Sequence, residues 1–216
     1  MNLEAARAQM LGQQIRAWEV LDERVLGALG RIPRESFVPD AYRELAFADL
    51  EIPLAHDQQM MMPKLEGRLL QALRLEPSDN VLEIGTGSGF LTACLADLAN
   101  SVVSVDIYAD FSRSANARIE QLNAGNVEFR TEDAFKIRRY EQFDAIAVTG
   151  SVPELDEHFI RMLGPGGRLF IVVGRAPVMD ARVVTMHERG EYAQESLFEF
   201  VITPLVNIEQ PEPFVL

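Results

Sequence analysis

The chain has 216 residues, of which 48% are hydrophobic and 25% are charged. This composition is typical of one globular domain with a sizeable core, and no apolar run approaches the ~18 residues of a membrane span. The 20 basic and 33 acidic residues give a formal net charge of −13, which disfavours nucleic acid as a partner because phosphates would be repelled.

The first third of the chain is predicted to be helical. Leu11, Ile15 and Trp18 recur at helical spacing, and Asp22 can cap a second helix. Prolines in segments 32–34 and 38–39 then interrupt the pattern, because proline lacks an amide donor and restricts the residue before it. We therefore expect residues 1–75 to form an N-terminal helical extension of a single domain that spans 1–216.

From residue 76 onward, short apolar runs alternate with helical segments, which is typical of βαβ units and a mostly parallel sheet. This pattern predicts a doubly wound α/β core over 76–216, and we expect antiparallel strands at its C-terminal end. The expected strands lie at 81–84, 102–105, 127–129, 143–148, 168–173, 183–186 and 197–202, and the expected helices at 91–98, 115–122 and 153–163.

Secretion, disulfides and metals are all disfavoured. The first twenty residues carry charges and lack a basic end followed by an apolar run, so we expect a cytoplasmic protein. Cys94 is the only cysteine, which leaves neither an internal disulfide nor a thiolate cluster for zinc. The histidines are scattered, so we expect no metal site.

The one basic cluster is interpreted as a solvated loop and comprises Arg130, Lys136, Arg138 and Arg139.

A glycine-rich turn follows the first predicted strand, in the sequence Glu83-Ile-Gly85-Thr-Gly87-Ser-Gly89-Phe90. Glycines allow a tight turn with positive φ and a close approach of ligand to backbone, and the helix that follows offers unpaired N–H groups. Asp106 ends the next strand about 20 positions later, where a carboxylate can accept hydrogen bonds from ribose hydroxyls. Together they predict a nucleoside ligand.

The identity of the nucleoside depends on two further positions. A dinucleotide fingerprint needs glycine where this chain has Phe90, so a nicotinamide dehydrogenase is disfavoured. An acidic side chain in Glu132-Asp133-Ala134, after the third strand, could accept the adenine amino hydrogens, although such an aspartate taken alone is more often an ordinary loop residue.

These motifs, with Leu163-Gly-Pro-Gly-Gly167, resemble the class I S-adenosylmethionine-dependent methyltransferases. Segments 32–39, 46–49, 53–54, 197–198 and 203–205 are similar, in order, to signatures of one branch, the protein L-isoaspartyl O-methyltransferases. The resemblance spans nearly the whole chain. It implies a Rossmann-like methyltransferase fold, S-adenosylmethionine as the cofactor, and repair of proteins by methylation of isoaspartyl carboxylates. It implies cofactor contacts from Glu83, Gly85, Thr86, Gly87, Gly89, Asp106, Asp133 and Ala134.

The resemblance breaks in the predicted substrate loop, His56-Asp-Gln-Gln-Met-Met61-Met-Pro63. The family's loop reads approximately His-Gly-Gln-Thr-Ile-Ser-x-Pro, and its serine lies at the substrate carboxylate, where this chain has Met61. A hydroxyl can donate to a carboxylate and a thioether cannot. Asp57, in place of the family's glycine, adds negative charge near a negative substrate. The candidates for acceptor contact are His56, Asp57, Gln58 and Met61, and no catalytic side chain is named.

Three functions remain open. The first is isoaspartyl carboxyl methylation, in which alignment of donor and acceptor carries the catalysis. The second is methylation of another protein or small-molecule acceptor, such as a neutral nucleophile that His56 or Asp57 could deprotonate. The third is cofactor binding without turnover, which the methionine permits. The sequence predicts neither the oligomeric state nor a role for residues 210–216.

Overall fold

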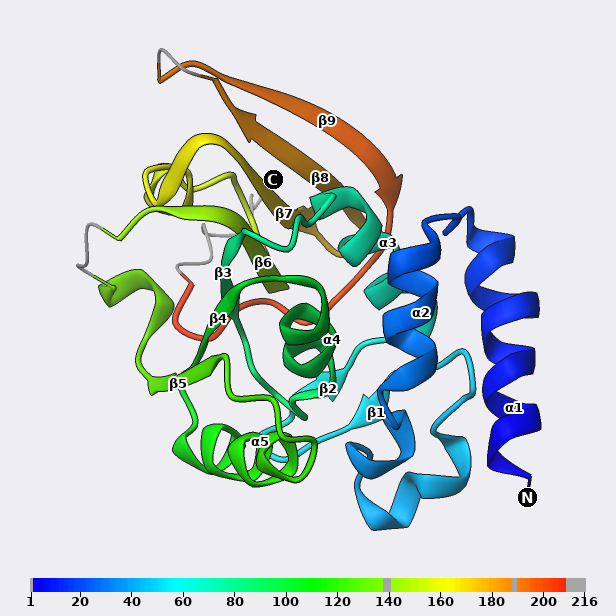
Figure 1. Cartoon of the computed structure of the whole chain (residues 1–216). Coiled ribbons are helices and arrows are strands. Elements are labelled where there is room, and N and C mark those ends of the chain that lie inside the picture. Colours follow the sequence, from blue (N-terminus) through cyan, green and yellow to red (C-terminus); the bar gives the residue numbers. More distant parts are fainter. Residues whose placement is uncertain (1, 138–140, 188–189, 209–216) are drawn as a thin grey trace, which may run out of the picture.

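The structure is a computed structural model that describes residues 2–137, 141–187 and 190–208. Its first third is helical, as predicted (Figure 1). Helix α1 (Leu3–Gln9) continues through a π-helical turn, η1 (Met10–Ile15), and a 3-10 turn, η2 (Arg16–Trp18). Helix α2 (Glu23–Arg31) begins at the predicted cap, where the Asp22 carboxylate accepts from the backbone N–H groups of Arg24 and Val25.

The predicted proline breaks are confirmed, and they lead into the segment that precedes the core. Two 3-10 turns, η3 (Arg34–Ser36) and η4 (Asp40–Leu45), follow Pro33 and Pro39. The short strands β1 (Ile52–Pro53) and β2 (Gln59–Met60) pair antiparallel. Helix α3 (Pro63–Leu73) starts directly after this ribbon, with proline in its first turn, where no amide donor is needed.

A seven-stranded sheet forms the centre of the molecule, in the order β5-β4-β3-β6-β7-β8-β9. The first five strands in this order are parallel to one another, and β8 and β9 are added antiparallel. The predicted doubly wound, mostly parallel sheet with C-terminal antiparallel strands is confirmed. The strands are β3 (Asn80–Ile84), β4 (Ser101–Asp106), β5 (Val127–Thr131), β6 (Phe143–Val152), β7 (Leu163–Arg175), β8 (Val178–Met186) and β9 (Tyr192–Glu199).

Two apolar clusters cover opposite faces of the sheet, because alternate side chains of a strand point to opposite sides. Val81 of β3 belongs to the cluster that includes the N-terminal helices, α3 and α4 (Phe90–Leu98). Leu82 belongs to the second cluster, which includes residues of α6 (Glu157–Ile160). Helix α5 (Ala109–Gln121) connects β4 to β5. The N-terminal extension therefore shares its core with the α/β part, and a division near residue 75 stays a prediction.

Two predicted elements differ most from the structure, and others begin earlier than expected, such as α5 at residue 109 instead of 115 and β8 at residue 178 instead of 183. The helix expected at 153–163 is reduced to the four residues of α6, because Asp156 caps it late and the glycine-rich segment from Leu163 already pairs with β6. The last strand runs over 192–199 instead of 197–202, and its exposed first half lacks the apolar alternation that would reveal it.

In the described parts of the chain, no helix is long and apolar enough to cross a membrane. Residues 210–216 lie outside the described residues.

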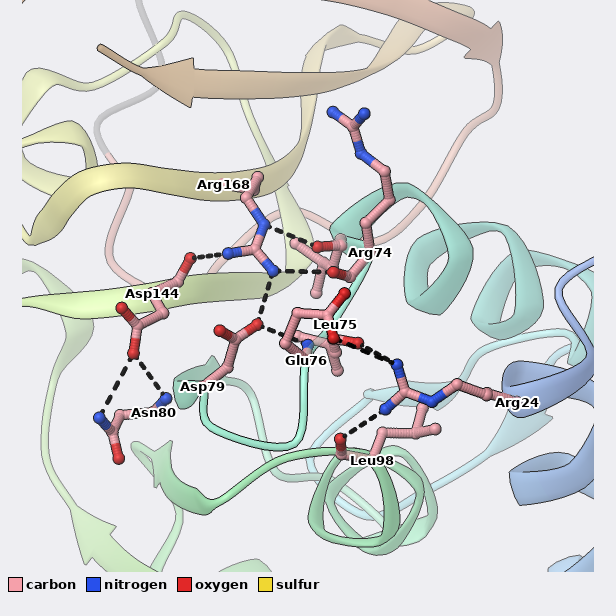
Figure 2. A network of polar contacts seen from close by, with 10 residues as sticks. Arg24, Arg74, Leu75, Glu76, Asp79, Asn80, Leu98, Asp144 and Arg168 are labelled. Carbon is pink, nitrogen blue, oxygen red and sulfur yellow. Dashed lines mark hydrogen bonds and ion pairs between the residues drawn. The ribbon is translucent and has the colours of Figure 1, made fainter. Parts of the chain in front are cut away.

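A nearly buried arginine joins α3 to the sheet (Figure 2). Arg168 of β7 donates through Nε to the Leu73 carbonyl oxygen at 2.9 Å and through Nη1 to that of Asp144 at 3.0 Å. Its Nη2 donates to the Arg74 carbonyl oxygen at 2.9 Å and pairs with the Asp79 carboxylate at 2.6 Å. One guanidinium thus satisfies the last carbonyls of α3, which would otherwise lack partners.

Replacing this guanidinium is expected to destabilise the fold. Arg168→Ala removes the partner of a buried carboxylate and of three carbonyl groups, so the free energy of unfolding falls by about 3 kcal/mol. The matched control is Arg74→Ala, because Arg74 takes part through its backbone and its side chain points away from the network (Figure 2); we expect a change within about 0.5 kcal/mol. Urea unfolding measures both, and equal effects would contradict this account.

Candidate functional site

The glycine-rich turn is shaped by positive φ angles and close neighbours. Gly85, Gly87 and Gly89 have φ values of 95°, 51° and 86°. A Cβ atom on Gly85 would lie 2.1 Å from Oγ1 of Thr149, and one on Gly89 would lie 2.6 Å from Cβ of Ala115. Both the backbone conformation and the available space therefore require glycine, and the turn keeps its backbone open on the side that faces the strand ends.

Asp106, the last residue of β4, faces this turn across the carboxyl edge of the sheet. Its Oδ2 accepts from the backbone N–H of Gly87 at 2.9 Å, and its Oδ1 accepts from that of Tyr108 at 2.9 Å. Burial raises the pKa of this carboxyl, and the backbone hydrogen bonds oppose the rise. The carboxylate is thus fixed in direction where β3 and β4 end, as the sequence predicted.

Glu83 lies behind the glycine turn. It is fully buried, and its Oε2 accepts from the hydroxyl groups of Thr92 and Ser104, each at 2.5 Å. Ser104 in turn shares a hydrogen bond of 2.6 Å with Thr86. Burial raises the pKa of Glu83 to about 8. Glu83 thus supports the turn from behind and is not among the residues that line the pocket described next; its contact with a ligand stays a prediction.

A pocket opens at the carboxyl edge of the sheet, in front of the glycine turn and the substrate loop. The space between its walls is about 1000 Å³, which includes open solvent at its mouth. The structure brings eight of the twelve candidates named from the sequence to this pocket, and leaves His56, Asp57, Glu83 and Gly89 outside its lining. The eight are Gln58, Met61, Gly85, Thr86, Gly87, Asp106, Asp133 and Ala134.

Asp133 reaches the pocket from the turn after β5. It caps a 3-10 turn, η5 (Ala134–Lys136), by accepting from the Phe135 N–H, and it also accepts from the side-chain amide of Asn207 at 3.1 Å. Burial raises the pKa of this carboxyl, but these hydrogen bonds outweigh it, so the pKa lies below its usual value. An ionised carboxylate is therefore present where the sequence predicted an adenine contact.

The substrate loop is held in place by His56. Its ring stacks on Tyr108 with centroids 4.0 Å apart, and its Nε2 lies 3.0 Å from a carboxylate oxygen of Asp110. His56 and Asp57 both have positive φ, at 57° and 55°, which explains why a glycine suits the second position. Asp57 is exposed. Both side chains therefore shape and anchor the loop, whose later residues, Gln58 and Met61, face the pocket.

The sequence did not reveal a buried ion pair beneath this loop. The Arg34 guanidinium pairs with the Glu66 carboxylate, donates to the Met61 carbonyl oxygen at 2.7 Å and donates to that of Ala46 at 2.9 Å. Glu66 lines the pocket. Burial raises its pKa to about 7, although the neighbouring guanidinium opposes the rise. The available signal was a charged residue one turn before Leu70 on the apolar face of the predicted helical region.

A second unpredicted part of the pocket comes from segment 202–206, whose residues all line it. After β9, the chain runs back to β6, where the Ser151 N–H donates to the Thr203 carbonyl oxygen and the Leu205 N–H donates to that of Ser151. In the sequence, residues 203–205 of this segment were recognised only by their similarity to the family's closing strand. Its place at the pocket depends on a backbone pairing between distant residues.

The basic cluster takes part in ordinary ion pairs. Arg130 pairs with Glu128 and Glu141, and Lys136 pairs with Asp133. Arg138 and Arg139 lie outside the described residues.

Sequence comparison decides the family. The model of the family described as "Protein-L-isoaspartate(D-aspartate) O-methyltransferase" matches residues 5–210. This chain belongs to that family. It is 35% identical over 211 residues to protein-L-isoaspartate O-methyltransferase 2 of Pelobacter propionicus, covering 96% of this chain and 93% of that protein. It is 36% identical over 210 residues to the Rhodopseudomonas palustris protein-L-isoaspartate O-methyltransferase, covering 94% and 96%.

Solved structures show the same fold. A protein-L-isoaspartate O-methyltransferase from Plasmodium falciparum, crystallised with S-adenosyl-L-homocysteine, superposes with a TM-score of 0.81 at 18% identity and covers 95% of this chain and 98% of that one. A second structure of the same name has a TM-score of 0.77 at 22% identity and covers 92% and 65%. The architecture described above is thus the Rossmann-like methyltransferase fold of this family.

The buried Glu83 carboxyl should make stability depend on pH. Its folded-state pKa of about 8 lies above the ordinary value of 4.5, so the stability present below 4.5 is lost as the pH rises towards 8. Glu83→Gln keeps an acceptor oxygen but cannot ionise. We therefore expect the unfolding free energy of the variant, relative to the native chain, to rise between about pH 5 and about pH 8. Urea unfolding at several pH values measures both free energies. The same pH dependence in the variant and in the native chain would be inconsistent with a protonated Glu83.

Proposed function

We propose that this chain transfers the methyl group of S-adenosylmethionine to the free carboxylate of isoaspartyl residues in proteins or peptides. Membership in the protein-L-isoaspartate O-methyltransferase family supports the reaction. The observation that carries the proposal is the pocket in which the glycine turn and Asp106 face each other, because together these features suit a nucleoside with free ribose hydroxyls.

The residues at the strand ends fit this cofactor. Gly85 and Gly87 line the pocket, so a ligand there would meet their backbone without an intervening side chain. The Asp106 carboxylate would accept from the ribose hydroxyls, and the ionised Asp133 would accept from the adenine amino group, with Ala134 beside it. Asp106, Asp133 and Glu132 also give the pocket negative charge, which complements a sulfonium ion.

The cofactor supplies an electrophilic methyl group, and the chain supplies alignment and shelter from water. Transfer to an ionised carboxylate requires no general base, so the rate depends on holding the two reacting atoms in line. Met60 and Met61 are buried and line the pocket, and their apolar side chains would exclude water from the acceptor. The Arg34 guanidinium fixes the loop that carries them by binding the Met61 carbonyl oxygen.

A second candidate is methylation of a different acceptor on the same fold. It is favoured by one observation: the loop position that carries a serine in the family carries Met61, which cannot donate a hydrogen bond to a carboxylate. A cofactor-binding protein without turnover is the remaining alternative, and it is distinguished by binding without transfer to any acceptor.

The primary test combines binding and transfer. We expect calorimetric titration with S-adenosyl-L-homocysteine to give saturable binding, and methyl transfer from S-adenosylmethionine to occur on an isoaspartyl peptide but not on its normal aspartyl counterpart. Binding with transfer to neither peptide would favour the second candidate, which a panel of other acceptors would then examine. Absence of binding would overturn the cofactor assignment.

The Asp106 carboxylate should determine affinity for the adenosyl ligand. Asp106→Ala removes a charged acceptor, and hydrogen bonds to charged groups contribute about 1.5–3 kcal/mol, so we expect S-adenosyl-L-homocysteine affinity to fall by about 10- to 100-fold. Asp40→Ala is the control, because the Asp40 side chain is exposed and Asp40 is not among the residues that line the pocket. Circular dichroism checks that both variants are folded. Unchanged affinity in a folded Asp106→Ala protein would place the ribose elsewhere.

A further inference from the structure

The acceptor end of the pocket contains a carboxyl group whose place is unusual. Glu66 lies in the first turns of α3, directly after the substrate loop, and only 2% of its surface is exposed. Its neighbours on the buried face of the helix are Leu65, Leu69 and Leu70. A carboxyl group in such a setting destabilises the fold unless it is paired or protonated. It nevertheless lines the same pocket as Met61.

Only one oxygen of this carboxyl has a hydrogen-bond partner among the described residues. Oε2 of Glu66 accepts a hydrogen bond from Nη1 of Arg34. Nε of that guanidinium binds the Ala46 carbonyl oxygen and its Nη2 binds the Met61 carbonyl oxygen. Oε1 of Glu66 therefore remains for a group that enters the pocket.

The surroundings favour a proton on Glu66 near neutral pH. Burial raises its pKa to about 7, while Arg34 opposes the rise. Two further titratable groups interact with it electrostatically from β3 and α4, namely Glu83 and Cys94, and burial raises the pKa of both, so both are largely uncharged at neutral pH. Glu51, before β1, is the other carboxyl at the substrate-loop side of the lining, and burial raises its pKa too.

We propose that Glu66, in its protonated form, donates from Oε1 the hydrogen bond to the isoaspartyl carboxylate that the Met61 thioether cannot donate. This inference rests on the proposed function and names the group that would make it possible in this chain. The residue would act as an acceptor-binding group and determine which acceptors are methylated. It lies in α3, five residues beyond the loop position at which the family carries its serine.

The charges balance when the acceptor is bound. Arg34 carries one positive charge, protonated Glu66 carries none, and the acceptor carboxylate carries one negative charge, so the buried cluster is neutral overall. Two carboxyl groups at one site cannot both ionise readily. The incoming carboxylate therefore increases the affinity of Glu66 for its proton. On transfer, a carboxylate oxygen forms a bond to the methyl carbon and the sulfur keeps the electron pair of the broken bond. The ester is uncharged, so Glu66 can then release its proton and pair with Arg34.

The pH dependence of acceptor binding tests the inference. Because the acceptor binds the protonated form, we expect its KM in the native chain to rise by about tenfold per pH unit above a pKa of about 7. Glu66→Gln carries a permanent amide donor and keeps an oxygen for Arg34. Its KM should therefore remain constant between about pH 6 and about pH 9, with kcat at the lower pH within about threefold of the native value.

Two matched variants separate Glu66 from other carboxyl groups. Glu51→Gln changes the other carboxyl on this side of the pocket, and Glu44→Gln changes an exposed glutamate on η4 that is not in the pocket lining. The inference requires both to keep the rise of KM with pH. The proposal is overturned if KM no longer changes with pH in Glu51→Gln but still rises with pH in Glu66→Gln. Glu51 would then be the group that donates to the acceptor.

Proton uptake gives a readout that does not depend on turnover. With S-adenosyl-L-homocysteine bound, titration of isoaspartyl peptide in buffers of different ionisation enthalpy should show uptake of close to one proton per peptide at about pH 8. Glu66→Gln should show none. Transfer with a pH-independent KM, or equal uptake in both proteins, overturns the inference alone. Cofactor binding without isoaspartyl methylation at any pH overturns the proposed function as well, so the two failures are distinguishable.

Discussion

The guanidinium of Arg34 is the interaction on which the acceptor side of the molecule depends. It is fully buried, and it binds a carbonyl group at the end of η4, a carbonyl group in the substrate loop and a carboxylate on α3. It also lies 4.7 Å from the centre of the Phe90 ring, at the start of the helix that follows the glycine turn. A buried charge is tolerated only with such complete pairing. Two irregular segments and helix α3 are thereby fixed relative to the glycine turn by one side chain.

The cofactor side is held by a different principle. There the proposed contacts come from the backbone of the glycine turn, which lines the pocket, so the conformation of this backbone must be maintained without side chains in front of it. Glycine residues supply the conformation, and the chain of hydroxyl groups from Thr86 through Ser104 to Glu83 supports the turn from behind. Thr149 adds a further hydrogen bond to the carbonyl oxygens of Ile84 and Gly85. The pocket is thus formed by a polar buried network on one side and an ion pair on the other.

Much of the fold and of the cofactor side could be predicted, because both depend on patterns of residues that are close together in the sequence. Alternating apolar runs identified the parallel strands, and glycine spacing followed by an aspartate at a strand end identified the ligand edge. What could not be predicted depends on pairings between distant residues. Arg34 and Glu66 are far apart in sequence. Arg34 lies in the family-like segment 32–39, but nothing in that segment indicates that its partner is Glu66, which belongs to no recognised motif. The place of segment 202–206 depends on its bonds to Ser151, and β9 lacks the alternation that marks a half-buried strand.

Segment 202–206 also has a bearing on the order in which the site is assembled during synthesis. The glycine turn, Asp106 and the substrate loop all emerge from the ribosome before it, and the wall that it forms requires β6 to be already in the sheet. A nascent chain that has paired its parallel strands would therefore still lack one wall of the pocket. The pocket is complete only when this segment docks on β6, which separates formation of the core from completion of the site.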